Sequence, residues 1–344
     1  MLRLYNTLTQ SSAMLLAMRL TAGILTYNDQ KYLARCLETL VSQQGLGELS
    51  RDWRIVILDN GSKDIEYLLE AKRKYPLIDF LLEKENYGFG KSHNDIMRRF
   101  PAEFHAVLNN DVLCASTFLA RIVEQLEKNS AYGSATGKLL RWHYGGNPEK
   151  TTIIDTVGIA ATKNHRFFDL GQGEEDRGQY DAGQTRFGAS GAAVIYRRSD
   201  LEKVRYGIDE FYDETMFMYK EDCDLAERLV AIGKPCLFVP EAVCWHDRTA
   251  SGTIDRSKRS QRERAGSAAH HSLIIQKHWQ WFSWTVRVSI FLREFFRWGF
   301  ILLREPVIFI RARSILRSTA KEARRRRKET KHAVSFEEVR HLFL

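Results

Sequence analysis

Short apolar runs alternate with segments whose apolar residues recur every three or four positions through the first part of the chain. Continuous apolar runs are typical of buried strands, and the longer spacing is typical of amphipathic helices. Strands alternating with helices favour a mostly parallel sheet with helices on both faces and right-handed crossovers. The predicted strands are Leu20–Tyr27, Arg54–Leu58, Ile78–Leu82 and His105–Leu108, and the predicted helices span residues 33–41, 65–75, 90–100 and 117–128.

The alternation of strand-like and helix-like segments weakens in the polar, glycine-rich stretch from Trp142 to Gln184. We expect a long excursion there, with a hairpin and a loop over a site. Regular periodicity returns afterwards. It predicts a strand within Gly188–Tyr196, a helix at Asp222–Ile232 and a strand at Cys236–Val239.

After Arg262 the chain mixes aromatic and basic residues. The longest charge-free apolar run is Trp298–Leu303, far short of the roughly twenty residues that a bilayer span needs. Such a mixture is typical of helices that lie on a membrane surface, although a helical pair packed on the core or on another subunit would have the same composition. The polybasic run Arg324–Lys328 favours an anionic membrane.

Length and charge refine this division without naming an activity. The chain has 344 residues and a net charge of +9, and much of the positive excess lies after Arg256. We expect an N-terminal extension (1–18), a catalytic domain (19–255) and a basic, aromatic-rich helical region (256–344). The five cysteines form no CxxC pair, which favours free thiols. The apolar patch Ala13–Met18 is too short for a span and lacks a cleavage site, so a cytoplasmic protein is expected.

Polar residues gather where the first four predicted strands end. The carboxyl ends of parallel strands meet at one edge of a sheet, where ligands bind. Each group alone is an ordinary turn signal, but four in series predict a binding cleft. Asp111 could hold a divalent ion that bridges a diphosphate, or it could cap the next helix. The four groups are Thr26-Tyr27-Asn28, Asp59-Asn60-Gly61-Ser62, Asn86-Tyr87-Gly88-Phe89-Gly90 with Asn94, and Asn109-Asn110-Asp111.

A second polar cluster, Glu221-Asp222-Cys223-Asp224, opens a predicted amphipathic helix. Acidic residues at a helix start usually complement the helix dipole. Three carboxylates within four positions exceed that need, and crowded carboxylates raise one another's pKa, which suits a general base. His246 follows a strand and is a candidate metal or diphosphate contact, although a lone surface histidine is an equally ordinary interpretation.

In this order, the motifs resemble inverting glycosyltransferase family 2. Three further segments are similar to its bacterial rhamnosyltransferase-like branch: Gly188-Ala189 through Arg197-Arg198, Phe211-Tyr212-Asp213-Glu214, and Met218 to Leu225. The resemblance covers about residues 21–252. It implies a GT-A fold, a nucleotide-diphosphate sugar donor linked to dTDP or UDP, and Mg²⁺ or Mn²⁺ as cofactor.

The same resemblance implies roles for individual residues. Asp111 would be the main metal ligand, since Asn109 replaces the first aspartate of the family's DxD element, and His246 would assist. Asp222 would be the catalytic base, with Glu221 its nearest rival. The strand-end residues would bind the nucleotide sugar, Asn94 among them. Gly188, Ala189, Ser190, Gly191 and Tyr219 would line the donor or acceptor pocket, although tight strand packing is an equal explanation for the glycines.

The expected activity is inverting transfer of a sugar, with rhamnose one candidate, to a lipid-linked or surface-polysaccharide acceptor at the inner face of the membrane. A glycan or glycolipid acceptor and an anionic membrane are therefore the expected partners. A sugar-1-phosphate nucleotidyltransferase would need a basic phosphate loop after the first strand, and Thr26–Lys31 supplies none. A non-enzymatic basic protein that binds membrane or nucleic acid is the third alternative, but carboxylates at the cleft would repel nucleic acid.

Overall fold

A computed structural model of the chain describes residues 18–145, 149–248 and 260–344. Residues 1–17 of the expected N-terminal extension lie outside the described residues. So do Gly252, near which the family resemblance ends, and the expected boundary between residues 255 and 256.

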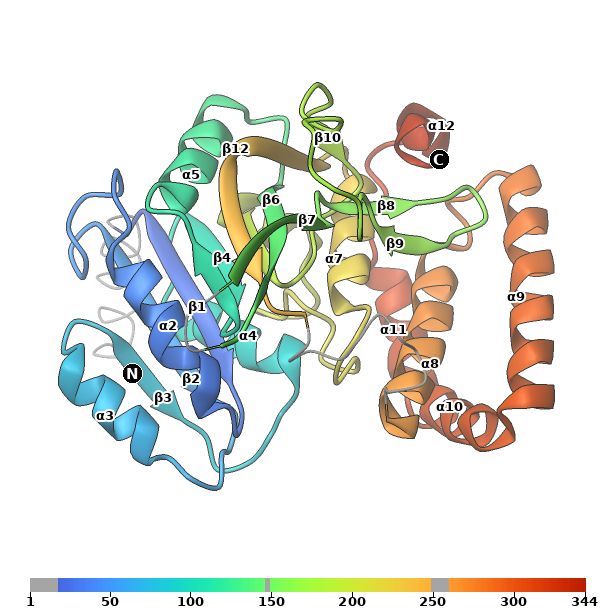
Figure 1. Cartoon of the computed structure of the whole chain (residues 1–344). Helices are drawn as coiled ribbons and strands as arrows, with labels where there is room; N and C mark the ends of the chain where they lie inside the picture. The colour runs from blue at the N-terminus through green and yellow to red at the C-terminus, as the bar shows by residue number, and fades with distance from the viewer. Residues whose placement is uncertain (1–17, 146–148, 249–259) are drawn as a thin grey trace, which may run out of the picture.

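The predicted alternation of strands and helices is confirmed. Strand β1 lies between β2 and β4, β3 pairs with β2, and all three pairings are parallel. Helices follow these strands along the chain, so the four strand ends meet at one edge of the sheet (Figure 1). The elements are β1 (Leu20–Thr26), α2 (Gln30–Val41), β2 (Trp53–Asp59), α3 (Glu66–Lys74), β3 (Asp79–Leu82), α4 (Phe89–Arg99), β4 (Phe104–Asn109) and α5 (Phe118–Lys128).

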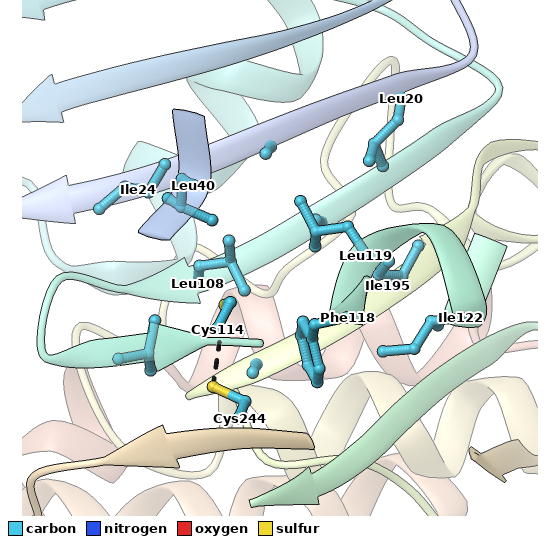
Figure 2. Close-up of a cluster of buried hydrophobic side chains, with 14 of the residues drawn as sticks. Leu20, Ile24, Leu40, Leu108, Cys114, Phe118, Leu119, Ile122, Ile195 and Cys244 are labelled. Atoms are coloured by element: carbon cyan, nitrogen blue, oxygen red, sulfur yellow. Dashed lines mark hydrogen bonds between the residues drawn. The ribbon is translucent and has the colours of Figure 1, made fainter. Parts of the chain in front are cut away.

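The main hydrophobic core fills the space between this sheet and the helices packed on it. Figure 2 shows Ile24 of β1 near Leu40 of α2 and Leu108 of β4. Leu20 lies further along the same strand, on the side of the α5 side chains. Cys114 and Cys244 lie in the same cluster, with their sulfur atoms 3.8 Å apart. All five cysteines are buried free thiols, as their spacing predicted. They act as small apolar side chains.

The sheet continues beyond β4 with antiparallel β11, so the mostly parallel character of its first half does not extend throughout. Strand β6 then pairs with β11, and β12 runs parallel to β6. The added strands are β5 (Val112–Cys114), β6 (Ser134–His143), β7 (Glu149–Thr156), β10 (Thr185–Arg186), β11 (Ala193–Arg197) and β12 (Cys236–His246).

The hairpin expected within residues 142–184 is confirmed, and the stretch holds more regular structure than its weak periodicity indicated. Strand β7 and the separate hairpin of β8 (Ile159–Ala161) and β9 (Phe167–Asp169) lie within it, and β6 begins before it. The periodicity of β6 is concealed because Lys138 interrupts a buried strand. Its ammonium group reaches out to Asp176 at 2.9 Å, so the strand is buried although its sequence is partly polar.

The C-terminal helices pack against the sheet domain at one end of the molecule (Figure 1). Lys277 of α8 is buried between Asp213 and Asp224, and Arg326 of α11 is buried against Asp213. Leu344 N donates to Ala161 O of β8 over 2.8 Å. The helices are α6 (Arg198–Val204), α7 (Glu221–Val230), α8 (Gln261–His278), α9 (Trp284–Arg304), α10 (Pro306–Ser318), α11 (Ala320–Glu329) and α12 (Phe336–Val339), followed by the short 3₁₀ helix η2 (Arg340–Leu342).

Candidate active site

The strand-end loops are joined to one another along the edge of the sheet. Each loop contacts the next through an asparagine, so the four groups predicted from the sequence form one continuous border. The links are Asn110 Nδ2 to Asp29 Oδ2 (3.2 Å), Asn28 N to Ser62 Oγ (2.7 Å) and Asn60 Nδ2 to Asn86 Oδ1 (3.0 Å).

Two residues of this border support it by accepting hydrogen bonds from backbone N–H groups of the Ser62 loop. The Asp59 carboxylate is buried and accepts from Ser62 N (2.9 Å) and Ser62 Oγ (2.5 Å). Asn28 adopts a left-handed conformation, with φ 51°, and its Oδ1 accepts from Lys63 N (2.9 Å). Asp59 therefore fixes the turn that presents Ser62, while Tyr27 on the neighbouring loop stays exposed.

The structure corrects the role expected for Asn94. Its side chain is fully buried, with Oδ1 accepting from Phe211 N and Tyr212 N and Nδ2 donating to Tyr212 O over 2.9 Å. Its hydrogen bonds thus hold the 211–212 backbone on α4. The Asn94 side chain therefore supports the fold and is not a ligand contact.

The glycines of the third loop are also explained by packing. A Cβ atom on Gly88 would lie 2.3 Å from Phe217 O, and one on Gly90 would lie 2.9 Å from Tyr212 Cβ. The atoms that approach these glycines closely therefore belong to the protein chain, where the sequence had led us to expect a ligand. The same holds for Gly188, whose Cβ would lie 2.3 Å from Ala226 Cβ, and for Ala189, which is buried in a hydrophobic cluster.

Asp111 and His246 come together although 135 positions separate them in the sequence. Asp111 leaves β4 just before β5 and caps no helix, since the N-cap of α5 is Thr117. His246 Nε2 lies 3.2 Å from Asp111 Oδ1, and its Nδ1 lies 2.8 Å from Asp155 Oδ2. Arg248 Nε in turn lies 2.6 Å from Asp155 Oδ1.

The charges of this group are interdependent. Burial lowers the pKa of His246, but Asp111 and Asp155 outweigh this effect and raise it to about 10. Burial raises the pKa of the Asp155 carboxyl, whereas His246 and Arg248 lower it, and the result is a lowered value. The two carboxylates and the two cations therefore stabilise one another in a buried site.

The pair Asp111 and His246 fits a divalent ion once the ion has displaced the Nε2 proton of His246, because histidine binds a metal as the neutral imidazole. Asp111 Oδ1 is buried and makes no well-aligned hydrogen bond within the described residues. Adjacent ligands of an octahedral ion with bonds of about 2.1 Å lie about 3 Å apart, close to the 3.2 Å between Asp111 Oδ1 and His246 Nε2. Asp155 would orient the imidazole from behind, as carboxylates do for metal-binding histidines. No cluster of three or more His, Cys, Asp or Glu suited to a metal occurs in the described part of the chain, so a bound diphosphate would have to complete the shell.

The second acidic cluster begins at a strained turn. Tyr219 and Lys220 both have positive φ, 69° and 79°, immediately before α7. Non-glycine residues persist in this conformation only where the surroundings hold them. At this turn His270 Nδ1 of α8 lies 2.9 Å from Tyr219 O. Asp222 is held by Cys223 N (2.7 Å) and Gly191 N (3.3 Å) at its carboxylate.

A cavity of about 740 Å³ joins the two groups. His246 and Asn109 line it, and so do Glu221 and Asp222. Of the other predicted residues, Phe89, Ser190, Gly191 and Tyr219 also line the cavity. Lys220, part of the Met218 to Leu225 segment, also lines the cavity. Among its remaining lining residues are Asp169, Gln172, Arg248, Glu263 and Ser267, which the sequence did not single out.

Glu221 and Asp222 differ in what they can do. Glu221 is buried, and burial followed by the adjacent Asp222 charge raises its pKa to about 8. It is therefore mostly protonated at neutral pH. Asp222 is only half-buried and makes no ion pair with any described residue. A carboxylate that faces a cavity without a neutralising cation is suited to take a proton.

Asp155 and Arg248, which orient His246, were not predicted from the sequence. Asp155 lies in the stretch of weak periodicity, so its strand position gave no signal. Arg248 is only two positions after His246, and the Trp-His-Asp-Arg run could have suggested it.

The family model described as glycosyl transferase family 2 matches residues 21–205, more than half of the chain. The chain belongs to this family. The order of its motifs predicted this family, and the strand-end border and the first residues that line the cavity lie within the matched part.

Curated family members agree with this assignment. An N-acetylglucosaminyltransferase of Rhizobium sp. (strain N33) is 26% identical over 61% of this chain and 44% of its own length. An N-acetylglucosaminyl-diphospho-decaprenol L-rhamnosyltransferase of Mycobacterium tuberculosis (strain H37Rv) is 34% identical over 30% of this chain and 33% of its own. The chain thus spans less than half the length of these relatives.

Solved structures confirm the GT-A fold. GalNAc-T7 with UDP, GalNAc and Mn²⁺ superposes with a TM-score of 0.55 at 14% identity, covering 76% of this chain and 48% of that one. S. aureus TarS 1-349 superposes with a TM-score of 0.53 at 14% identity, covering 91% and 89%. The described C-terminal helices are therefore joined to a domain of GT-A fold.

Proposed function

We propose that the chain is an inverting glycosyltransferase that moves a sugar from a nucleotide diphosphate to a hydroxyl group of a lipid-linked or surface-polysaccharide acceptor. The observation that carries the proposal is the cavity itself. On one wall it has Asp222, a carboxylate that makes no ion pair with a described residue, and at another it has His246 with its neighbour Asp111. A base and a diphosphate site are what direct displacement at a sugar carbon requires.

In this mechanism Asp222 accepts the proton of the acceptor hydroxyl. The oxygen then bonds to the anomeric carbon from the face opposite the diphosphate, and the carbon–diphosphate bond breaks with its electron pair. A divalent ion held by Asp111 and His246 would neutralise charge on the departing diphosphate. Protonated Glu221 keeps a second negative charge away from Asp222, and Gly191 N fixes the orientation of the base.

The donor is proposed to be a dTDP- or UDP-linked sugar, with rhamnose and N-acetylglucosamine the first candidates. The printed names of the two relatives refer to these sugars. UDP and Mn²⁺ occur in the name of a solved structure of the same fold. The names also support a diphospho-lipid acceptor, because one relative is named for N-acetylglucosaminyl-diphospho-decaprenol.

A donor panel tests the proposal. Release of nucleoside diphosphate is measured for dTDP-rhamnose, UDP-N-acetylglucosamine and related donors with Mn²⁺ or Mg²⁺. Asp111→Ala should lower turnover about 100-fold, whereas Glu70→Ala on the exposed face of α3 should leave it unchanged. If the wild type neither binds nor turns over any donor, the proposed function is wrong.

We also propose that α9 and α10 bind an anionic membrane at its inner, cytoplasmic face. Two acidic residues, Glu294 and Glu305, occur in this stretch, and both pair with arginines. The same two helices carry exposed cations and exposed apolar side chains. The exposed cations are Arg304, Arg311, Arg313 and Arg317. No helix among the described residues has the length and apolar character needed to cross a bilayer. The exposed apolar residues are Trp284, Val288, Phe291, Leu292, Phe295, Phe296, Phe300, Leu302, Leu303, Val307 and Ile310.

The polybasic run contributes less to this surface than its composition suggested. Arg326 is buried and pairs with Glu210 at 2.6 Å as well as with Asp213. Arg325 pairs with Glu322 and Glu329. Arg324, Arg327 and Lys328 remain exposed to meet lipid phosphates.

Sedimentation with vesicles tests this contact. The double substitution Phe295→Ser and Phe296→Ser should weaken binding to anionic vesicles at least about tenfold, because two exposed aromatic side chains are lost. Leu77→Ser, which removes an exposed apolar residue far from α9, is the matched control. Deletion of the whole region is unsuitable, because it would also remove the buried Lys277. Equal binding by the wild type and the double variant would contradict the proposal.

A further inference from the structure

A second cavity of about 240 Å³ lies between α8, α9 and the β8–β9 hairpin. Four cationic side chains line it: Lys220, Arg264, Arg293 and Arg297. Their positions span the turn before α7, helix α8 and helix α9, so three separate elements bring positive charge to one small space.

The neighbouring carboxylates do not balance these cations. Glu294 contacts both Arg293 (2.8 Å) and Arg297, and Glu305 contacts Arg264 (2.7 Å). Lys220 makes no ion pair within the described residues; its Nζ lies 3.8 Å from Cys223 Sγ. Two carboxylates thus pair with three of these four half-buried cations, which leaves an excess of positive charge at the cavity that a bound anion would offset.

Two further observations point to an anionic ligand. Arg264 Nε is buried and has no hydrogen-bond acceptor among the described residues. Burial lowers the pKa of Arg293, and the nearby Arg297 and Arg166 add to this effect against Glu294. His271, which also lines the cavity, is kept neutral because burial lowers its pKa well below the usual value. A phosphate group would satisfy both the free N–H donor and the excess charge.

The cavity is continuous with the catalytic one on the side of the base. The two share Phe167, Lys220 and Ser267, and Lys220 is two positions before Asp222. The catalytic cavity alone is lined by Asn109 and His246, where the donor diphosphate is proposed to bind. Lys220, whose φ is positive, lines both cavities. An anion in the basic cavity therefore reaches the reaction from the acceptor side.

Helix α9 supplies the direction from which such a ligand arrives. Arg293 and Arg297 line the basic cavity, while Phe291, Phe295 and Phe296 of the same helix are each more than 60% exposed. One face of α9 thus offers cations to a phosphate, and another offers aromatic rings to a hydrocarbon chain.

We propose that the basic cavity of Lys220, Arg264, Arg293 and Arg297 binds the phosphate groups of a lipid-linked acceptor, so that its sugar hydroxyl lies at Asp222. The proposal rests on the proposed function and adds the site at which the acceptor is recognised. Diphosphate is also the chemistry of the donor, so the experiment must separate the two sources.

Binding of inorganic pyrophosphate is measured first, by calorimetry in the presence of EDTA, so that the metal-dependent donor site contributes nothing. The wild type should bind it, and Arg264→Gln with Arg293→Gln should weaken binding about tenfold or more. Arg293→Lys should retain most of the affinity because it keeps the charge, and thermal unfolding checks that each variant is folded. Arg73→Gln on exposed α3 is the control. Absent binding by the wild type, or equal binding by the folded double variant, would overturn the proposal.

Kinetics then assign the source. The acceptors are farnesyl-diphospho-N-acetylglucosamine and octyl N-acetylglucosaminide, which lacks phosphate. Arg293→Gln should raise the KM of the first acceptor about tenfold and leave both the KM of the donor and kcat/KM of the octyl glycoside unchanged. A raised donor KM, or an equal loss with both acceptors, would overturn the assignment to the acceptor. Because pyrophosphate binding is read without turnover, an inactive wild type would contradict the proposed function without obscuring the binding result.

Discussion

Asp222 and Asp224 are two residues apart on α7, yet their surroundings are opposite. Asp222 is half-buried on the catalytic cavity and makes no ion pair with a described residue. Asp224 is fully buried, lies 2.9 Å from Arg228 Nε and also pairs with Lys277 of α8. One carboxylate is available for chemistry, and the other is neutralised on both sides.

The difference comes from residues distant in the sequence. Lys277 also binds Asp213 at 2.6 Å, and Arg228 donates to Val204 O and Phe211 O. This network fixes the turn and the start of α7, and so places Asp222. An acidic cluster in a sequence can therefore contain a base and a structural anchor, which only the cations brought by the fold tell apart.

Removing the base should produce the largest effect. Asp222→Asn keeps the size of the side chain but cannot accept a proton, so kcat should fall about 1000-fold. The KM of the donor and the thermal midpoint should change little, because Asp222 contributes to no ion pair with a described residue. Steady-state kinetics with an accepted donor and acceptor measure this.

The matched variant is Asp224→Asn. It should lower stability, with turnover per folded molecule largely retained. If Asp222→Asn remains fully active, or if Asp224→Asn causes the larger loss of turnover in folded protein, the assignment of the two carboxylates is wrong.

Removing the cation of the anchor should act on stability. Lys277→Met leaves Asp213 and Asp224 buried with one partner fewer, which should cost about 3 kcal/mol of unfolding free energy. Urea denaturation measures the loss. Lys74→Met breaks an exposed pair with Glu38 and should leave the free energy of unfolding nearly unchanged. Equal effects of the two substitutions would show that the buried network does not stabilise the fold.

The first half of the fold was predictable because local pattern and environment agree there. Strands β1, β2 and β4 are buried on both faces and read as continuous apolar runs. Strand β6 was missed because a buried lysine satisfied by Asp176 looks like a surface residue in the sequence. The burial of α8 was equally hidden, since its charged Lys277 and its histidines face the interior.

The candidate site was predictable where it depends on strand ends, and less so where it depends on packing. Asn109, Asp111 and His246 were found as motif positions and do lie together. Asn94, Gly88 and Gly90 share the same motifs but serve the 211–217 segment. A motif records which residues occur together, and it does not distinguish those that touch a ligand from those that hold the loops in place.

The smallest effect is expected for the remaining carboxylate of the cluster. Glu221→Gln mimics the protonated acid, which is the main form at pH 7 when the pKa is about 8. Turnover at pH 7 should change less than about threefold. If this variant loses as much turnover as Asp222→Asn, Glu221 is the base and the comparison must be reversed.

The pH dependence of stability provides a second, independent test of the protonation state of Glu221 with the Glu221→Gln variant. The raised pKa means that folded protein keeps a proton which the unfolded chain loses near pH 4.3. This contribution to stability is complete below that pH, declines as the pH rises, and is lost once the pH passes about 8. Glu221→Gln cannot ionise, so the thermal midpoint of the wild type should fall relative to that of the variant between about pH 5 and pH 8. Above pH 8 the difference between the two midpoints should stay constant. A constant difference across the whole range would mean that Glu221 is already ionised in the folded protein, and two adjacent carboxylates would then share the role of base that we assign to Asp222.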